Sequence, residues 1–270
     1  MKKLIFSLVS IALAASIMLS ASYSVLFAYA LRDGIAALTS PVLKLTAPAD
    51  KYLEENPYRV KNTVSLSTSD KNFSSAFKGL GGSVELSRDG ENIKIVTGSG
   101  STDKKIILHE GYIYLYKYTS REGKKMLKAM PTKEQLKESD IGSTGSYNFD
   151  LRDFGDVMIT EEDGKKVIRF SELDKNELKK LRKSILGDVE GFKVDITDFS
   201  LTTVLDSGKY EKMTLEFNFK FTGDNGYSFI AKYKSVTKYE YDDVVVKDPD
   251  PNNDSYKTVS FDELMEEMIN

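Results

Sequence analysis

Apolar and polar residues alternate over two long segments in the later part of the chain. Residues 212–221 carry an apolar side chain at every odd position, and residues 229–241 carry aromatic or small residues at odd positions after the turn at 223–226. Because successive side chains of a strand point to opposite faces, this pattern predicts a hairpin of two long strands. One face would be apolar and aromatic and the other charged, which is typical of a large antiparallel sheet with one face in water.

Shorter alternating segments surround this hairpin. Residues 60–68 alternate cleanly, and short apolar runs separated by turn residues follow up to residue 119, which predicts an antiparallel meander. Residues 194–205 form a further strand that joins the hairpin through the turn at 206–208. Its alternation slips between Ile196 and Phe199, which predicts a β-bulge.

Helical patterns interrupt the strands. A helix of one or two turns is expected at 50–55, between the prolines Pro41 and Pro48 and the terminator Pro57, and another at 131–137. Residues 174–187 give a stronger helix signal, with the capping box Asp174/Glu177 and an apolar stripe, and residues 260–263 open a terminal helix. The basic face at 179–183 suits solvent or anionic lipid headgroups. The combined pattern of strands and helices therefore predicts an α+β protein.

The first residues form a hydrophobic leader. Lys2 and Lys3 precede residues 4–31, which contain no charged side chain. A basic start, an apolar core and the sequence Ala28-Tyr29-Ala30 predict a signal peptide cleaved after Ala30. As a helix the same stretch would span about 40 Å, enough for an uncleaved membrane anchor. Both alternatives predict an extracytoplasmic domain of the bacterial cell envelope, either secreted or membrane-anchored.

Composition excludes several kinds of chemistry. The chain has no cysteine, which excludes lipoprotein acylation, disulfides, thiolate metal sites and cysteine nucleophiles. Its net charge of −3 is unfavourable for binding nucleic acid. We find neither a repeat nor a low-complexity linker. We therefore expect a leader (1–31), a connector with a short helix (32–56) and a single domain (57–270).

The order of these elements resembles the LolA/LppX-like lipoprotein-carrier fold, including exported Gram-positive relatives. The resemblance covers residues 57–249 and is most evident at 194–246: a strand with Asp195 and Asp206, a tight turn, then the two long strands and the sequence 242–246. It implies a large curved antiparallel sheet, a half-barrel, with helices packed on one face. In that family the concave face receives acyl chains of lipids or lipoproteins, and no catalytic residues are implied.

The aromatic face of the predicted hairpin is the candidate ligand site. Two interpretations remain open: the face is ordinary core covered by the helix at 174–187, or it is a hollow that holds an apolar ligand. The residues concerned are Phe217, Phe219, Phe221, Phe229, Tyr233, Tyr239 and Tyr241.

Other polar and aromatic patterns give weaker signals. Tyr112, Tyr114, Tyr116 and Tyr118 share one strand face and suit cross-strand packing or a binding platform. His109 is the one histidine and has no nucleophile or second ligand nearby in sequence. We therefore predict no enzyme, no metal and no cofactor.

Two functions follow from these patterns. The first is an exported non-enzymatic domain that binds a lipid or lipoprotein acyl chain, or another apolar ligand, with the membrane as a further partner if the leader is uncleaved. The alternative is an envelope interaction or scaffold module with a sealed core and no ligand.

Overall fold

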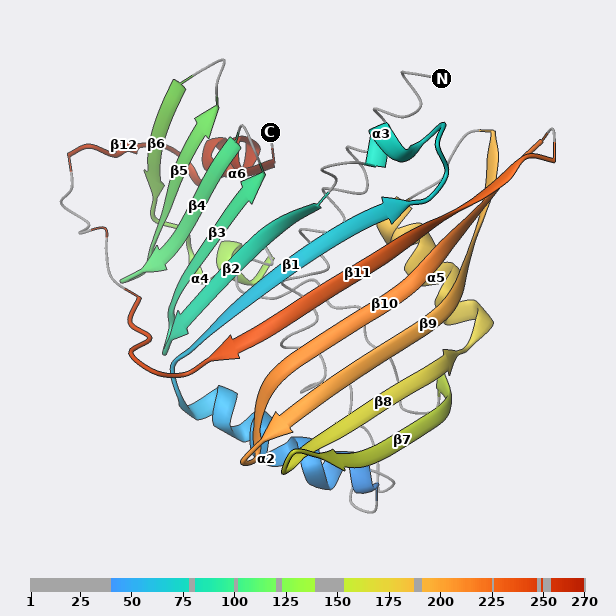
Figure 1. Cartoon of the computed structure of the whole chain (residues 1–270). Helices are drawn as coiled ribbons and strands as arrows, with labels where there is room; N and C mark the ends of the chain where they lie inside the picture. The colour runs from blue at the N-terminus through green and yellow to red at the C-terminus, as the bar shows by residue number, and fades with distance from the viewer. Residues whose placement is uncertain are drawn as a thin grey trace.

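The computed structural model of the chain describes residues 40–77, 81–99, 102–119, 123–138, 153–186, 191–224, 226–246, 249 and 254–269. These residues form one 12-stranded sheet with helices beside it (Figure 1). The predicted leader and the predicted cleavage site after Ala30 lie outside the described residues. Within the described part of the chain, no helix is long and apolar enough to cross a bilayer.

Most strands follow one another as hairpins. In chain order they are β1 (Tyr58–Thr68), β2 (Gly81–Asp89), β3 (Asn92–Ser99), β4 (Thr102–His109), β5 (Tyr112–Thr119), β6 (Gly123–Ala129), β7 (Phe154–Glu162), β8 (Lys165–Leu173), β9 (Phe192–Asp206), β10 (Lys209–Gly223), β11 (Ser228–Glu240) and β12 (Lys257–Thr258). The helices are α2 (Pro41–Glu55), α3 (Ser74–Phe77), α4 (Lys133–Glu138), α5 (Lys175–Leu186) and α6 (Phe261–Ile269).

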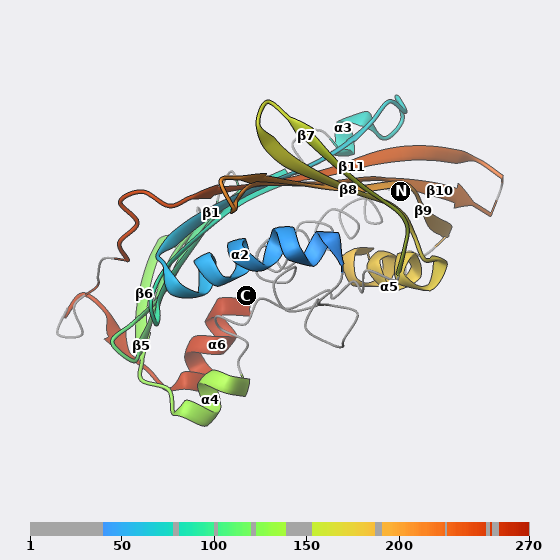
Figure 2. The same ribbon diagram turned by 90° about the horizontal axis from the view of Figure 1, so that it is seen from below.

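The sheet is open and curved. Its order is β12-β6-β5-β4-β3-β2-β1-β11-β10-β9-β8-β7, so β1 and β11 join the two meanders at the centre. Figure 2 shows the sheet bending around α2, α5, α4 and α6, which lie on its concave side. The expected α+β class with a large curved sheet is confirmed. The sheet is mixed rather than wholly antiparallel, because the two-residue β12 pairs parallel with β6.

Helix α2 is longer than the sequence indicated. It runs for 15 residues, with Pro41 in its first turn and Pro48 inside it, where we expected interruptions. Pro41 is tolerated because the first helical N–H groups need no intrahelical acceptor. The helix continues through Pro48 because it buries a stripe against the sheet, formed by Val42, Thr46, Ala49 and Leu53.

The predicted bulge is present in β9. Between the pairs Glu216/Ser200 and Asn218/Thr197, β9 advances by one residue more than β10. Asp198 takes a positive φ of 53° there, and its carboxylate accepts a hydrogen bond from Asn218 Nδ2 at 2.6 Å. The extra residue reverses which side chains of β9 face the core.

Side chains cap helices α5 and α6 as the sequence predicts, and α4 has a cap that we did not predict from the sequence. Asp174 Oδ1 accepts a hydrogen bond from the backbone N–H of Asn176 at 2.7 Å at the start of α5, and Ser260 Oγ accepts one from Glu263 at 3.2 Å at the start of α6. In α4, Thr132 and Gln135 bond each other reciprocally.

The sheet carries separate apolar clusters. The largest lies under α2 and α5 and includes the concave sides of β1 and β8–β11. A second, centred on Leu115 and Leu264, joins β5 and β6 to α6. On the opposite face of β5, Tyr114 packs with Ile107, Val246 and Tyr256. At these residues β4 and β5 are therefore covered on both faces.

Candidate functional site

The predicted aromatic residues share the concave face of β10 and β11. Six of them are at most 7% exposed, and Tyr241, just after β11, is half-buried. Phe221 stacks on Phe229 with ring centroids 4.7 Å apart, and Phe217 stacks on Tyr233 at 4.5 Å. Such pairs form because residues directly opposite in an antiparallel ladder bring their side chains together.

The structure divides this set into two groups. A buried polar band separates them, in which Asn62 Nδ2 donates to Ser235 Oγ at 2.8 Å and to Thr237 Oγ1 at 2.7 Å. On one side of the band lie the phenylalanines and Tyr233, and on the other lie Tyr239 and Tyr241. The predicted residues therefore do not form one continuous aromatic surface.

The second group lies around a half-buried carboxyl group on α2. Tyr210 Oη donates to Asp50 Oδ1 at 2.6 Å, and Tyr241 Oη donates to the carbonyl oxygen of Tyr210 at 2.7 Å. Burial raises the pKa of Asp50 to about 6, although the hydrogen bond from Tyr210 opposes this shift. Tyr210 itself stays protonated, because burial and the nearby carboxyl group raise its pKa well above 10.

The first group is covered by helices. Leu181, Ile185 and Leu186 of α5 are 0–1% exposed and belong to the same cluster. At the other end, Phe73 precedes α3 and stacks on Phe229 with centroids 4.3 Å apart. The aromatic face is thus buried along most of its length.

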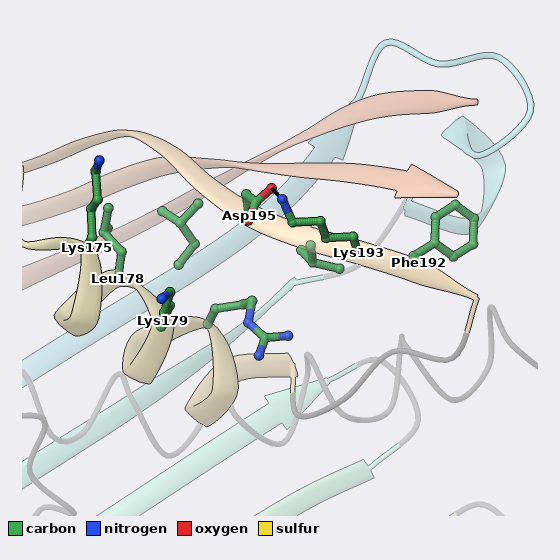
Figure 3. Close-up of a pocket in the computed structure, with 9 residues that line it drawn as sticks. Lys175, Leu178, Lys179, Phe192, Lys193 and Asp195 are labelled. Atoms are coloured by element: carbon green, nitrogen blue, oxygen red, sulfur yellow. Dashed lines mark ion pairs between the residues drawn. The ribbon is translucent and has the colours of Figure 1, made fainter. Parts of the chain in front are cut away.

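A groove opens at the edge of this core, between α5 and the first half of β9. β8 pairs only with the part of β9 between Ser200 and Leu205. At the end of β8 the chain leaves the sheet and forms α5. Within the described residues β9 therefore has no strand neighbour on that side before Ser200, and the space has a volume of about 400 Å³. Figure 3 shows the side chains that line it: Lys175, Leu178, Lys179, Arg182, Phe192, Lys193, Val194, Asp195 and Ile196.

The groove has an apolar floor that adjoins the aromatic core. Val194 and Ile196 point to the concave side and are 4% and 8% exposed. The ring of Phe192 lies 6.2 Å from that of Phe221 and 6.0 Å from that of Phe229. Phe192 therefore connects the groove to the predicted aromatic residues.

The rim of the groove is basic. Lys175, Lys179 and Arg182 extend from one flank of α5, and Lys193 lies on β9 opposite them. Among the described residues that line the groove, Asp195 alone is acidic, and its carboxylate pairs with Lys193 at 3.1 Å. The arrangement combines an apolar floor with an excess of positive charge.

Sequence reasoning missed this groove. The positions 175, 178, 179 and 182 follow the spacing of one helix flank, which is a detectable signal. What the sequence does not indicate is that this flank faces residues 192–196, because that placement depends on how α5 packs on the sheet.

The weaker candidates remain apart from the groove. Tyr114 is buried in a cluster and Tyr118 is 44% exposed, so the tyrosine row is partly core. His109 ends β4, far along the sheet from α5. The described residues contain no group of three or more acidic or histidine side chains that could hold a metal ion.

No protein-family model and no curated protein matches the sequence. The solved structures with slight similarity include two dehydratases. An inactive CurJ dehydratase mutant in complex with a compound has 9% identity, 82% coverage of both chains and a TM-score of 0.12. The dehydratase domain from the CurJ module of the curacin polyketide synthase has 8% identity, covers 74% of this chain and 80% of its own, and has a TM-score of 0.13. At such TM-scores neither structure informs the fold or the function of this chain.

Proposed function

We propose that this protein is an exported, non-enzymatic domain whose curved sheet acts as a half-barrel and binds the acyl chain of a lipid, or another apolar ligand. This proposal rests on the groove between α5 and β9. Its volume lies at the lower end of the range of about 300–1,000 Å³ that is usual for ligand sites. The predicted resemblance to LolA/LppX-like carriers, whose concave face receives acyl chains, agrees with it.

The packing of the groove favours an apolar ligand. Leu178 and Phe192 are only half-buried, so their apolar surfaces face the open space. Covering such surface is favourable by about 25 cal/mol per Å². A chain that lies on Val194 and Ile196 would extend the apolar core through Phe192.

A scaffold module without a ligand is the second candidate. The closed packing of Leu181, Ile185 and Leu186 over the aromatic face favours it, because ligand entry there would require α5 to move. The two candidates differ in one observable property, the uptake of an apolar probe.

The test is uptake of a fluorescent long-chain fatty acid by the full chain held in a non-ionic amphipol. The Leu178→Trp variant should fill the groove and lower uptake by about tenfold, since a ligand can no longer cover the floor. Ile230→Trp is the matched control, because Ile230 is 46% exposed on the outer face of β11.

Thermal unfolding of both variants checks that each is folded. Equal uptake by wild type and Leu178→Trp would exclude the groove as the site. No uptake by wild type, together with native mass spectra free of bound lipid, would leave the scaffold function as the better account.

A further inference from the structure

We propose that the ligand of the groove is a single acyl chain with an anionic headgroup, held at the basic rim formed by α5 and β9. This inference rests on the proposed function and specifies the class of ligand. The simplest ligand of this class is a long-chain fatty acid.

The cations on α5 lie on the flank that faces the groove. Lys175, Lys179 and Arg182 are at positions i, i+4 and i+7, so they follow one another along the helix beside Leu178. Lys175 and Lys179 are exposed, and neither forms an ion pair with another described residue (Figure 3). Both ammonium groups therefore keep their charge available to a ligand.

Lys175 places a positive charge at the positive end of the dipole of α5. It is the first residue of α5, where the helix dipole is positive and a cation is unfavourable. The cap Asp174 and Glu177 suit that end, and Glu177 pairs with Lys180 on another flank. An anion bound beside Lys175 would relieve this repulsion.

The charge balance of the groove selects an anion. Of the described residues that line it, four are cationic, whereas Asp195 alone is acidic and is already paired with Lys193. This local excess is opposite in sign to the net charge of −3 of the whole chain. Positive side chains around a partly desolvated site attract a negatively charged ligand and disfavour a neutral one of the same shape.

The shape of the groove selects a single chain. A volume of about 400 Å³ is small for a ligand site, and the floor is a narrow strip from Phe192 to Ile196. Because the basic side chains stand at the rim and the apolar ones at the floor, the headgroup and the chain have separate places. A ligand with one tail and one anionic head fits both.

The test compares two photoreactive probes on the full chain in a non-ionic amphipol at low ionic strength. One is a diazirine analogue of palmitic acid and the other is the corresponding alcohol, which has the same chain without the charge. The acid should label the segment 192–196 about tenfold more than the alcohol, and added salt should reduce this preference.

Two double variants of α5 test whether the preference for the acid depends on Lys175 and Lys179. Lys175→Gln/Lys179→Gln should lower labelling by the acid about tenfold and leave labelling by the alcohol unchanged. Lys180→Gln/Lys183→Gln removes the same charge from other positions of α5 and should change neither. Competition by unlabelled palmitate or by lysophosphatidylglycerol supports the inference and shows whether a carboxylate or a phosphate is preferred.

Two results would overturn the inference in different ways. Equal labelling by acid and alcohol, unaffected by either double variant, would exclude the anionic headgroup and leave the proposed apolar site intact. Absence of labelling by both probes would contradict the proposed function itself.

Discussion

Asp50 is the residue whose ionisation is most directly linked to packing. Its carboxyl group lies between α2 and β10, accepts a hydrogen bond from Tyr210, and has a pKa of about 6 because burial disfavours the charged form. Glu54, one helical turn later, raises the pKa further. Protonation of Asp50 therefore strengthens the contact of α2 with the sheet.

We predict that the contribution of Asp50 to the stability of wild type falls as pH rises. The pKa in the folded state exceeds the ordinary value of 3.8, so the folded state binds the proton more tightly than the unfolded state. This contribution is complete below about pH 4 and is lost as pH passes 6, at a cost of about 2–3 kcal/mol. Asp50→Asn should remove the loss, because the neutral amide oxygen still accepts from Tyr210.

Urea unfolding of both proteins between pH 4 and pH 8 measures the difference. Asp50→Asn should be the more stable protein at pH 8 and similar to wild type at pH 4. Parallel pH profiles for the two proteins would contradict the assigned role of Asp50.

At the scale of elements, α2 shows how tertiary packing overrides local preference. Pro48 has no N–H to donate within the helix, yet α2 continues to Glu55 and is completed by the hydrogen bond from Asn56 N to Tyr52 O at 3.0 Å. Burial of Ala49 and Leu53 against the sheet offsets the missing bond.

Pro48→Ala should therefore stabilise the protein. The exposed position tolerates alanine, and the new N–H can donate to the carbonyl group of Lys44, so we expect a gain of about 1 kcal/mol in the free energy of unfolding. Ala47→Pro, at the neighbouring exposed position, should act in the opposite direction. Thermal unfolding measures both, and an unchanged or lower midpoint for Pro48→Ala would contradict this account of α2.

The elements that the sequence predicted are those determined by neighbours along the chain. The sequence predicts the alternation in β10 and β11, the β-bulge in β9 and the caps of α5 and α6, because each depends on residues close in sequence. The full length of α2, the parallel pairing of β12 and the groove depend on contacts between distant segments. Only the folded chain brings Lys179 near Lys193.

At the scale of the whole molecule, one continuous sheet carries separate apolar clusters. The cluster under α2 and α5 shares no residue with the cluster around Leu115 and Leu264 under α6. Since each cluster is completed by its own helices, we expect the two ends of the sheet to open independently.

Hydrogen exchange tests this independence. Leu264 is 0% exposed, so Leu264→Ala should leave a cavity and speed exchange in α6 and β4–β6. Protection in β9–β11 should stay the same. Leu181→Ala, in the other cluster, should give the reverse pattern, and equal acceleration over the entire sheet in both variants would show a single cooperative unit.

The bulge at Asp198 makes the groove sensitive to the length of β9. Before the bulge the even-numbered residues Val194 and Ile196 face the core, whereas after it the odd-numbered Phe199 and Leu201 do so. Deleting one residue here would restore a regular ladder and turn Lys193 and Asp195 inward in place of the apolar floor. A substitution in this strand changes one side chain, whereas the insertion or deletion of a single codon would replace the whole apolar floor of the groove with charged side chains.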